Sequence, residues 1–240
     1  MTDIPESHPR YLSLKMREDL VKGVEEGITS KAGLIAHGRG EMFDYLIGEE
    51  TIETAERAER KAVERMLNAE NPVISVNGNV VALVPGGIVE LAERLDSKIE
   101  VNLFHRTDER MSKIQKALEQ NGAEEVYGLD PKEKIPGLDH KRALCSYEGI
   151  YTSDVILVPL EDGDRAEALK EMGKEVITID LNPLSRTSKS ADITIVDNIV
   201  RAVPNMMELE PLEEEFDNGE NLRAALEFMS ERLRTLSEEI

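Results

Sequence analysis

The stretch DVILVPLEDGDRAEALKEMGKEVITIDL, Asp154–Leu181, decides the fold. An apolar run, a segment with helical spacing and a second apolar run follow one another, which is the order of a βαβ unit. The same pattern extends to both sides, with further expected strands and helices at 73–76, 85–95, 98–104, 107–122 and 191–197. This alternation predicts a doubly wound α/β fold with a mostly parallel sheet. Asn77-Gly78, after the run VISV, is also compatible with a β-hairpin, which ranks second because helical spacing soon resumes.

The flanking segments predict helices on either side of this core. Residues 1–71 form an N-terminal helical region around a glycine-rich stretch, residues 72–204 the α/β core and residues 205–240 an acidic tail, within one compact unit. Apolar residues recur along the tail at Leu222, Leu226, Met229, Leu233, Leu236 and Ile240. This narrow stripe predicts a C-terminal helix that packs either on its own chain or on a second subunit.

Composition excludes several classes of function. The net charge of −20 argues against nucleic acid as a partner, because duplex binding requires a basic face. The single cysteine cannot form an intrachain disulfide, and we find neither a signal-peptide pattern nor an apolar run of transmembrane length. We therefore expect a cytoplasmic protein that binds no membrane. A small phosphorylated ligand remains compatible with the charge, because a few local arginines are sufficient to hold it.

The stretch KAGLIAHGRGEMFDYLIGEET, residues 31–51, places His37 and Arg39 between glycines in an apolar run. Gly38 and Gly40 would allow close approach of the backbone, and Arg39 would supply a cation. The pattern favours a loop that grips an anionic ligand. The alternative is a tight turn with a surface arginine.

Ligands of open parallel sheets bind beyond the carboxyl ends of the strands. Polar residues follow the expected strands at these ends: Asn77, Asn79, His105, Arg106, Glu161, Asp162, Asp197 and Asn198, with the polar segment Asp180–Ser190. In that segment, hydroxyls and Arg186 suit phosphate and ribose oxygens, and Asp180 suits a hydroxyl or a metal ion. A polar turn explains its composition equally well. The Walker A motif, the dinucleotide fingerprint and the spacing of Cys/His metal ligands are all absent from the sequence.

Five stretches, in one order, resemble a known family: HPRYLSLKMREDLVKGVEEGI, GLIAHGRGEMFDYLIGE, ISVNGNVVALVP, EVNLFHRTDER and VITIDLNPLSRTSKSADITIVDNIVRAVPNM. They are similar to the archaeal 4-phosphopantoate–β-alanine ligases, or phosphopantothenate synthetases, from about His8 to the end of the chain. The resemblance implies a Rossmann-like domain, a homodimer, and the ATP-dependent joining of 4-phosphopantoate and β-alanine in coenzyme A biosynthesis, with release of AMP and pyrophosphate.

The resemblance also implies which residues contact ATP: Arg17, Arg39, Asp180, Leu181, Asn182, Arg186, Thr187, Asn198 and Ile199. All but Arg17 lie where the local pattern had already indicated a site, whereas Arg17 alone is typical of a solvated helix face. We expect Mg²⁺ to bridge the triphosphate. The glycine-rich stretch around Arg39 then becomes a phosphate-gripping loop.

The remaining strand-end residues, Asn77, Asn79, His105 and Arg106, are expected near phosphopantoate. His105 and Arg106 are the candidates for a catalytic role, although a histidine at a strand end is often only hydrogen-bonded. Two other functions remain open. One is an oxidoreductase that binds a nicotinamide cofactor in the same crevice, and the other is a nucleotide-sensing module without catalysis.

Overall fold

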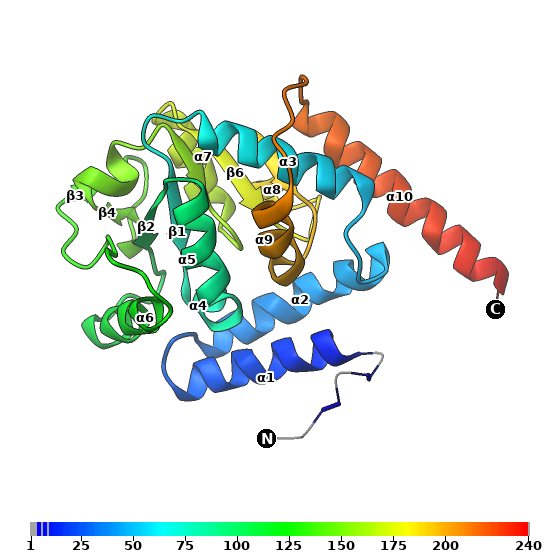
Figure 1. Cartoon of the computed structure of the whole chain (residues 1–240), viewed down its shortest axis with the longest axis horizontal. Coiled ribbons are helices and arrows are strands. Elements are labelled where there is room, and N and C mark those ends of the chain that lie inside the picture. Colours follow the sequence, from blue (N-terminus) through cyan, green and yellow to red (C-terminus); the bar gives the residue numbers. More distant parts are fainter. Residues whose placement is uncertain (1–3, 6, 9, 240) are drawn as a thin grey trace.

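A parallel sheet lies at the centre of the molecule (Figure 1). The computed structural model describes residues 4–5, 7–8 and 10–239. Within this part, the strands of the main sheet are β1 (Val73–Val76), β2 (Lys98–Val101), β5 (Val155–Leu157), β6 (Glu175–Ile179) and β7 (Ile193–Ile195). Their order is β2-β1-β5-β6-β7, and every adjoining pair is parallel. The predicted doubly wound, Rossmann-like sheet is confirmed.

Helices cover the sheet and extend beyond it. They are α1 (Tyr11–Glu25), α2 (Lys31–Ile47), α3 (Glu53–Leu67), α4 (Gly78–Leu83), α5 (Pro85–Arg94), α6 (Asp108–Gln120), α7 (Gly163–Glu171), α8 (Arg186–Ser190), α9 (Ile199–Glu208) and α10 (Asn218–Glu239), with the short helices η1 (Lys141–Ala143) and η2 (Tyr147–Tyr151). A two-residue pair, β3 (Glu133–Lys134) and β4 (Leu144–Cys145), forms a separate antiparallel ribbon that the sequence did not predict.

The two faces of the sheet bury different apolar clusters. Successive side chains of a strand point to opposite faces, and Ile74 of β1 joins the cluster with α3, α5, α6 and α9, whereas Val73 joins the cluster with α7. Ile156 of β5 lies with Val73, while its neighbour Leu157 lies with Ile74. Because both faces are covered, these strands are continuous apolar runs, the pattern that identified them.

The glycine-rich stretch around Arg39 is not a loop, so that prediction is wrong. It lies inside the continuous helix α2, which Ser30 caps by accepting a hydrogen bond from the backbone N–H of Gly33 at 3.2 Å. The helix ends at Gly48, in the left-handed conformation at φ +90°. Each interior glycine disfavours a helix by only about 1 kcal/mol, so good caps and tertiary packing override the local preference.

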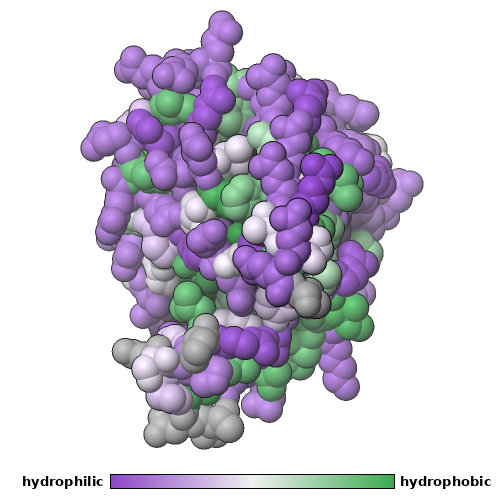
Figure 2. All heavy atoms as spheres, turned by 90° about the vertical axis from the view of Figure 1, so that its right-hand side faces the viewer, coloured by the Kyte–Doolittle hydropathy of each residue, from purple (hydrophilic) through white to green (hydrophobic). Residues whose placement is uncertain are grey.

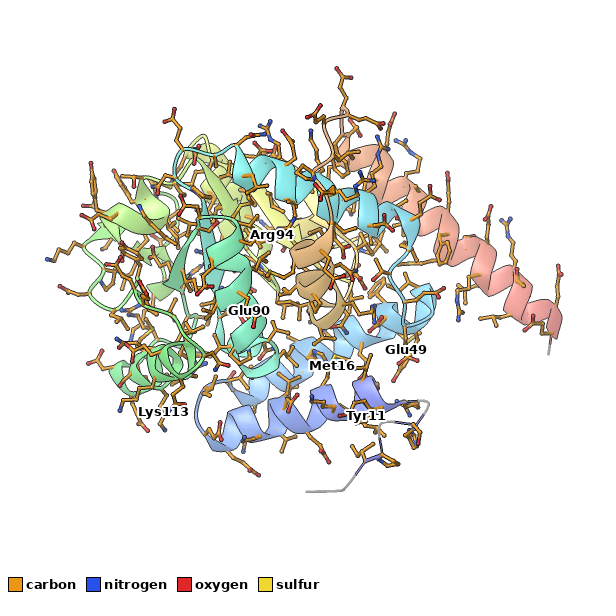
Figure 3. All side chains as sticks on the ribbon, in the orientation of Figure 1. Tyr11, Met16, Glu49, Glu90, Arg94 and Lys113 are labelled. Atoms are coloured by element: carbon orange, nitrogen blue, oxygen red, sulfur yellow. The ribbon has the colours of Figure 1, made fainter. Side chains whose placement is uncertain are left out.

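The N-terminal helices pack against the carboxyl edge of the sheet. Helix α1 contacts α4 and α2, and Met16 lies on its side facing α2 (Figure 3). The contact with α4 is close, because a Cβ at Gly23 would lie 2.8 Å from Cβ of Ala82. The hairpin alternative after β1 is excluded, since Asn77 instead starts α4 by accepting from the N–H groups of Asn79 and Val80.

Helix α10 is half docked and half free. Its first turns bury Leu222 and Met229 against a cluster that includes Ile47 of α2. Its last turns project from the body (Figure 1), where Leu233 and Leu236 are 51% and 38% exposed. The stripe thus packs on its own chain over its first half, and its predicted last member, Ile240, lies outside the described residues.

The surface is largely hydrophilic, with apolar patches between the charged side chains (Figure 2). This agrees with the composition, which has 49 acidic residues against 29 basic ones. In the described part of the chain, none of the helices combines the length and apolarity needed to cross a bilayer.

Candidate functional site

The order of the strands creates a crevice between β1 and β5. From β1 the chain moves outward to β2, then returns to β5 and continues in the opposite direction through β6 to β7. At such a switch point the connections leave in opposite directions, and the carboxyl ends of the two strands open a gap that ligands occupy. Here the gap is lined by Asn79 after β1 and by Leu160 to Gly163 after β5. Helix α2 covers this gap at the carboxyl edge of the sheet.

The larger cavity at this edge has a volume of about 660 Å³. Eight of the nine residues expected to contact ATP line it: Arg39, Asp180, Leu181, Asn182, Arg186, Thr187, Asn198 and Ile199. They come from α2 and from the ends of β6 and β7, so the fold brings together positions that are far apart in sequence. Their contacts with a ligand remain predictions.

The segment after β6 is a rigid cradle built on Asp180. Its carboxylate accepts hydrogen bonds from Oγ of Ser185 at 2.5 Å and from the backbone N–H of Asn182 at 2.9 Å. Ser185 in turn caps α8 by accepting from the N–H of Ser188 at 2.9 Å. Burial raises the pKa of Asp180, and these hydrogen bonds partly offset that effect. Because Asp180 is used internally, the segment presents mainly its backbone and Arg186 to the cavity.

A second buried network supports the cavity wall where β7 ends. Asn198 donates from Nδ2 to Asp44 of α2 at 2.8 Å, and Arg201 bridges Asp44 at 2.6 Å and Asp197 at 2.5 Å. Asn198 also caps α9 by accepting from the N–H of Val200. The side chain of Asn198 therefore ties α2 to the start of α9.

Two basic side chains of the larger cavity differ in their pairing. Arg186 is exposed and forms an ion pair with Glu167 at 2.6 Å. Arg39 has neither a hydrogen-bond nor an ion-pair partner among residues 4–5, 7–8 and 10–239. Beside it, the buried Nε2 of His37 also lacks a partner in the described part, and burial lowers the pKa of this imidazole. Buried polar atoms are normally paired, so Nε2 of His37 is available to a ligand, and the exposed Arg39 offers an uncompensated cation to an anionic one.

Arg17 does not line the cavity, unlike the other residues expected to contact ATP. It forms an ion pair with Glu41 of α2 at 2.7 Å and donates to the hydroxyl of Tyr45 at 2.9 Å. The side chain lies close enough to His37 for its charge to contribute to the lowered pKa of that imidazole. In the single chain, Arg17 therefore reaches the cavity only indirectly, through α2.

A smaller cavity of about 340 Å³ adjoins the first on the β2 side. Asn77, Asn79 and His105, which were expected near phosphopantoate, line it, and their contact with a substrate remains a prediction. Arg106 does not line it, and this part of the prediction is corrected. Its guanidinium is buried and donates to the carbonyl oxygens of Gly128 at 2.6 Å and Leu129 at 2.9 Å, which fixes the segment after α6.

Arg110 occupies the place that had been expected of Arg106. It lines the smaller cavity and donates to the carbonyls of His105 at 2.7 Å and Ile28 at 2.9 Å, and its Nε has no partner among the described residues. Burial lowers its pKa, and no ion pair compensates its charge in this part of the chain. No local pattern distinguished Arg110 from Arg106, because the direction of α6 decides which of the two faces the cavity.

The two cavities share a wall made of Ala36, Asn79, Leu160 and Asp162. Leu160 has a left-handed backbone at φ +54°, a conformation that a non-glycine residue seldom adopts and that costs on the order of 1 kcal/mol or more. Its carbonyl oxygen accepts a hydrogen bond from Nδ2 of Asn77 at 3.1 Å. The turn at Leu160 thereby directs the chain after β5 across the gap and sets Glu161 and Asp162 at its edge.

Below this wall lies a cluster of paired charges that sequence reasoning missed. Glu161 is 1% exposed and pairs with Arg142 at 2.7 Å and with the fully buried Arg165. Arg142 also binds Asp162 at 2.5 Å, and Arg165 donates to Ser75 of β1 at 3.0 Å. Two cations and two anions balance, which allows them to lie inside the protein. Arg142 lies in the short helix η1, and no local pattern distinguished it.

A metal site built by the protein alone is not evident in the part of the chain that the structure describes. No three or more His, Cys, Asp or Glu side chains converge there in an arrangement that could hold an ion. Carboxylates at the cavities, such as Asp180 and Glu161, are engaged in internal bonds.

Comparison with known proteins identifies relatives over the whole length of the chain. A family model described as phosphopantothenate/pantothenate synthetase matches residues 54–233. A protein of Thermococcus kodakarensis named 4-phosphopantoate–β-alanine ligase is 56% identical, over 100% of this chain and 97% of its own. Proteins of the same name from Methanosarcina mazei and Methanospirillum hungatei are 56% and 51% identical, over 100% and 96% of this chain and 99% and 98% of their own.

Proposed function

The chain belongs to the phosphopantothenate/pantothenate synthetase family, and we propose that it is an ATP-dependent ligase that condenses 4-phosphopantoate with β-alanine to 4′-phosphopantothenate. The observation that carries the proposal is the name 4-phosphopantoate–β-alanine ligase, shared by relatives that match the chain from end to end. The pair of adjoining cavities supports it, because a ligation requires the nucleotide and the acid to meet at one point.

The chemistry requires the carboxylate to be activated first. A carboxylate does not acylate an amine at neutral pH, because its oxygen is a poor leaving group. Attack of the phosphopantoate carboxylate on the α-phosphate of ATP gives an acyl-adenylate and pyrophosphate, and the amine of β-alanine then displaces AMP. We place ATP in the larger cavity and phosphopantoate in the smaller one, so that the reacting groups meet at the shared wall of Asn79, Leu160 and Asp162.

Electrostatic positioning is then the main contribution of the protein. Three groups of negative charge gather: the triphosphate, the phosphate of the substrate and its carboxylate. Arg39 and Arg186 are assigned to the triphosphate and Arg110 to the phosphate of phosphopantoate, each charge-assisted contact contributing about 1.5–3 kcal/mol. Mg²⁺ fits this site as part of the bound nucleotide, held by phosphate oxygens, since the described carboxylates form no cage of their own.

We further propose that the enzyme acts in the cytoplasm as a homodimer. Exposed apolar side chains lie on α2, at Ile35 and Met42, and at the free end of α10, at Leu233 and Leu236. Larger apolar patches on a protein surface mark contacts with other molecules. Sedimentation of the purified protein tests the dimer, and a monomer at micromolar concentration would contradict it.

Mass spectrometry tests the reaction directly. The protein is incubated with ATP, Mg²⁺, 4-phosphopantoate and β-alanine, and each component is omitted in turn. Phosphopantothenate and AMP are expected only in the complete mixture. ADP in place of AMP would overturn the adenylate route and leave a ligase. No product from folded protein that still binds ATP would favour a nucleotide-sensing module.

A further inference from the structure

We propose that Asp162 binds the ammonium group of β-alanine and holds its nitrogen against the activated carboxyl group at the junction of the two cavities. The inference rests on the proposed function and assigns it a third binding site, which neither the resemblance nor the relatives' names specify. The structure carries it through the position of Asp162, its unusual hydrogen bonding and its one free oxygen.

Position is the first argument. An amine that attacks an acyl-adenylate must approach where the nucleotide and the acid meet, and four residues line both cavities. Ala36 and Leu160 are apolar. The amide of Asn79 is occupied, because Nδ2 donates to the carbonyl of Gly33 at 3.0 Å and Oδ1 accepts from the hydroxyl of Thr29. Asp162 is thus the one ionisable side chain of the described residues that faces both cavities.

The hydrogen bonding of Asp162 differs from that of most aspartates at the N-cap of a helix. Asp162 is the N-cap residue of α7, and an aspartate there ordinarily accepts from a backbone N–H of the first turn, which stabilises a helix by about 1 kcal/mol. Here the side chain makes no such bond and turns instead to Arg142, with Oδ2 at 2.5 Å from Nη1. A residue that forgoes a local stabilising bond commonly serves a site.

The carboxylate retains a free acceptor. Its side chain is 53% exposed, and its second oxygen, Oδ1, has no partner among the described residues, whereas the adjoining Glu161 has both oxygens paired. An ammonium needs only one or two such acceptors. Mg²⁺ would require near-octahedral coordination by six oxygens, which the one free oxygen of Asp162 does not supply.

The step balances without any further reactant. The ammonium of β-alanine loses one proton to water, and its nitrogen lone pair forms the C–N bond with the acyl carbon. The C–O bond to the adenylate breaks, its electron pair leaves with AMP, and the nitrogen releases a second proton to water. Asp162 orients the nitrogen throughout, and its exposure gives the protons a path to solvent.

The experiment compares Asp162→Asn with Asp164→Asn in the full-length protein. Asp164 also lies in the first turn of α7 but binds His140 at 3.0 Å and lines neither cavity, so it controls for charge removal at this helix end. Steady-state kinetics give the Michaelis constant for each substrate. Hydroxylamine, which is uncharged at neutral pH, replaces β-alanine in a second assay that traps the acyl-adenylate as a hydroxamate.

We expect Asp162→Asn to raise the Michaelis constant for β-alanine at least tenfold, with hydroxamate formation within threefold of wild type. Asp164→Asn should change neither. An unchanged constant for β-alanine, or a rise in the constant for MgATP instead, would overturn the assignment. Loss of hydroxamate in Asp162→Asn from folded protein would also overturn it, since the residue would then act in adenylate formation. If wild type itself forms no hydroxamate and exchanges no pyrophosphate into ATP, the adenylate route of the proposed function falls first.

Discussion

The charged groups of the site fall into two regions that differ in how they are paired. In one region, buried ions are closed into pairs: Arg142 and Arg165 bind Glu161, and Arg201 binds Asp44 and Asp197, although Arg142 also lines the smaller cavity. In the other region, Arg39 and Arg110 face the cavities without a carboxylate partner in the described residues, whereas the exposed Arg186 of the larger cavity pairs with Glu167.

The difference separates structural cations from binding cations. Other arginines, such as Arg106, also lack an ion pair, but Arg39 and Arg110 are set apart from it because they line the cavities. A closed pair stabilises the fold because each ion compensates the desolvation of the other. A cation without a carboxylate partner keeps its attraction for an anionic ligand. Substitutions in the first region should therefore change stability, and those in the second should change binding.

Arg165→Met should produce the largest effect. Arg165 is fully buried, and its loss leaves Glu161 with one cation and Ser75 without its partner. We expect the free energy of unfolding, measured by urea denaturation, to fall by about 3–5 kcal/mol. Lys170→Met is the control, since Lys170 forms a half-exposed pair on the same helix, worth under about 1 kcal/mol. Equal effects of the two substitutions would remove the distinction between closed and exposed pairs.

Glu59→Gln should change how stability depends on pH. Glu59 is buried near Asp197, and burial, with that neighbouring carboxylate, raises its pKa to about 8 from an ordinary value of 4.5. The folded protein keeps a proton that the unfolded chain releases, so this stabilising contribution is complete below pH 4.5 and is lost as the pH rises to about 8.

The wild type should therefore lose about 1.4 kcal/mol per pH unit relative to Glu59→Gln between pH 5 and 8. Thermal or urea unfolding at several pH values measures the difference. The exposed Glu53→Gln on the same helix should leave the pH dependence as in wild type, because Glu53 does not contribute to the raised pKa of Glu59. Parallel stability curves for wild type and Glu59→Gln would contradict the raised pKa.

Arg39→Ala should weaken ATP binding by roughly 10- to 100-fold, the equivalent of about 1.5–3 kcal/mol for a charge-assisted contact. Stability should not fall, because Arg39 is exposed and makes no bond within the described part of the chain. Calorimetric titration with ATP measures the affinity, and Arg223→Ala, on the exposed side of α10, is the control. Unchanged affinity in Arg39→Ala would return the residue to the role of a surface arginine.

Arg110→Ala should raise the Michaelis constant for phosphopantoate by about tenfold, the smallest of the four effects, because two of its donors remain tied to backbone carbonyls in the wild type. Arg106→Ala is the paired comparison: it should lower stability and leave this constant nearly unchanged, since its donors hold Gly128 and Leu129. The opposite result would restore Arg106 as the substrate residue and exclude Arg110.

Local patterns predicted the sheet well, because most strands are apolar runs buried on both faces, although β2 carries Lys98 and Glu100. Chain order then sufficed to place Asn77, Asp180 and Asn198 at one edge of the sheet. Long-range pairing was not predictable. Arg142 reaches Asn102 and Glu161 from the short helix η1, and nothing within its own stretch indicates those partners.

Two errors came from judging single residues by local preference. The glycines around Arg39 suggested a loop, although Ser30 and Gly48 are typical helix caps and would have indicated α2. Arg106 and Arg110 both follow β2, and nothing in the local sequence distinguishes their roles. Only the direction of the helix that follows decides which one faces the cavity.

Leu160, whose backbone is left-handed and which lies between the two cavities, limits the substitutions that this protein accepts at that position. Glycine at position 160 would relax the backbone at φ +54°, but it would also remove a side chain that packs against the main apolar cluster. Leu160 also supplies part of the wall that the two cavities share. The strained backbone is therefore retained because the side chain is needed, and a random library selected for folded, active protein should keep a large apolar residue at this codon and reject glycine.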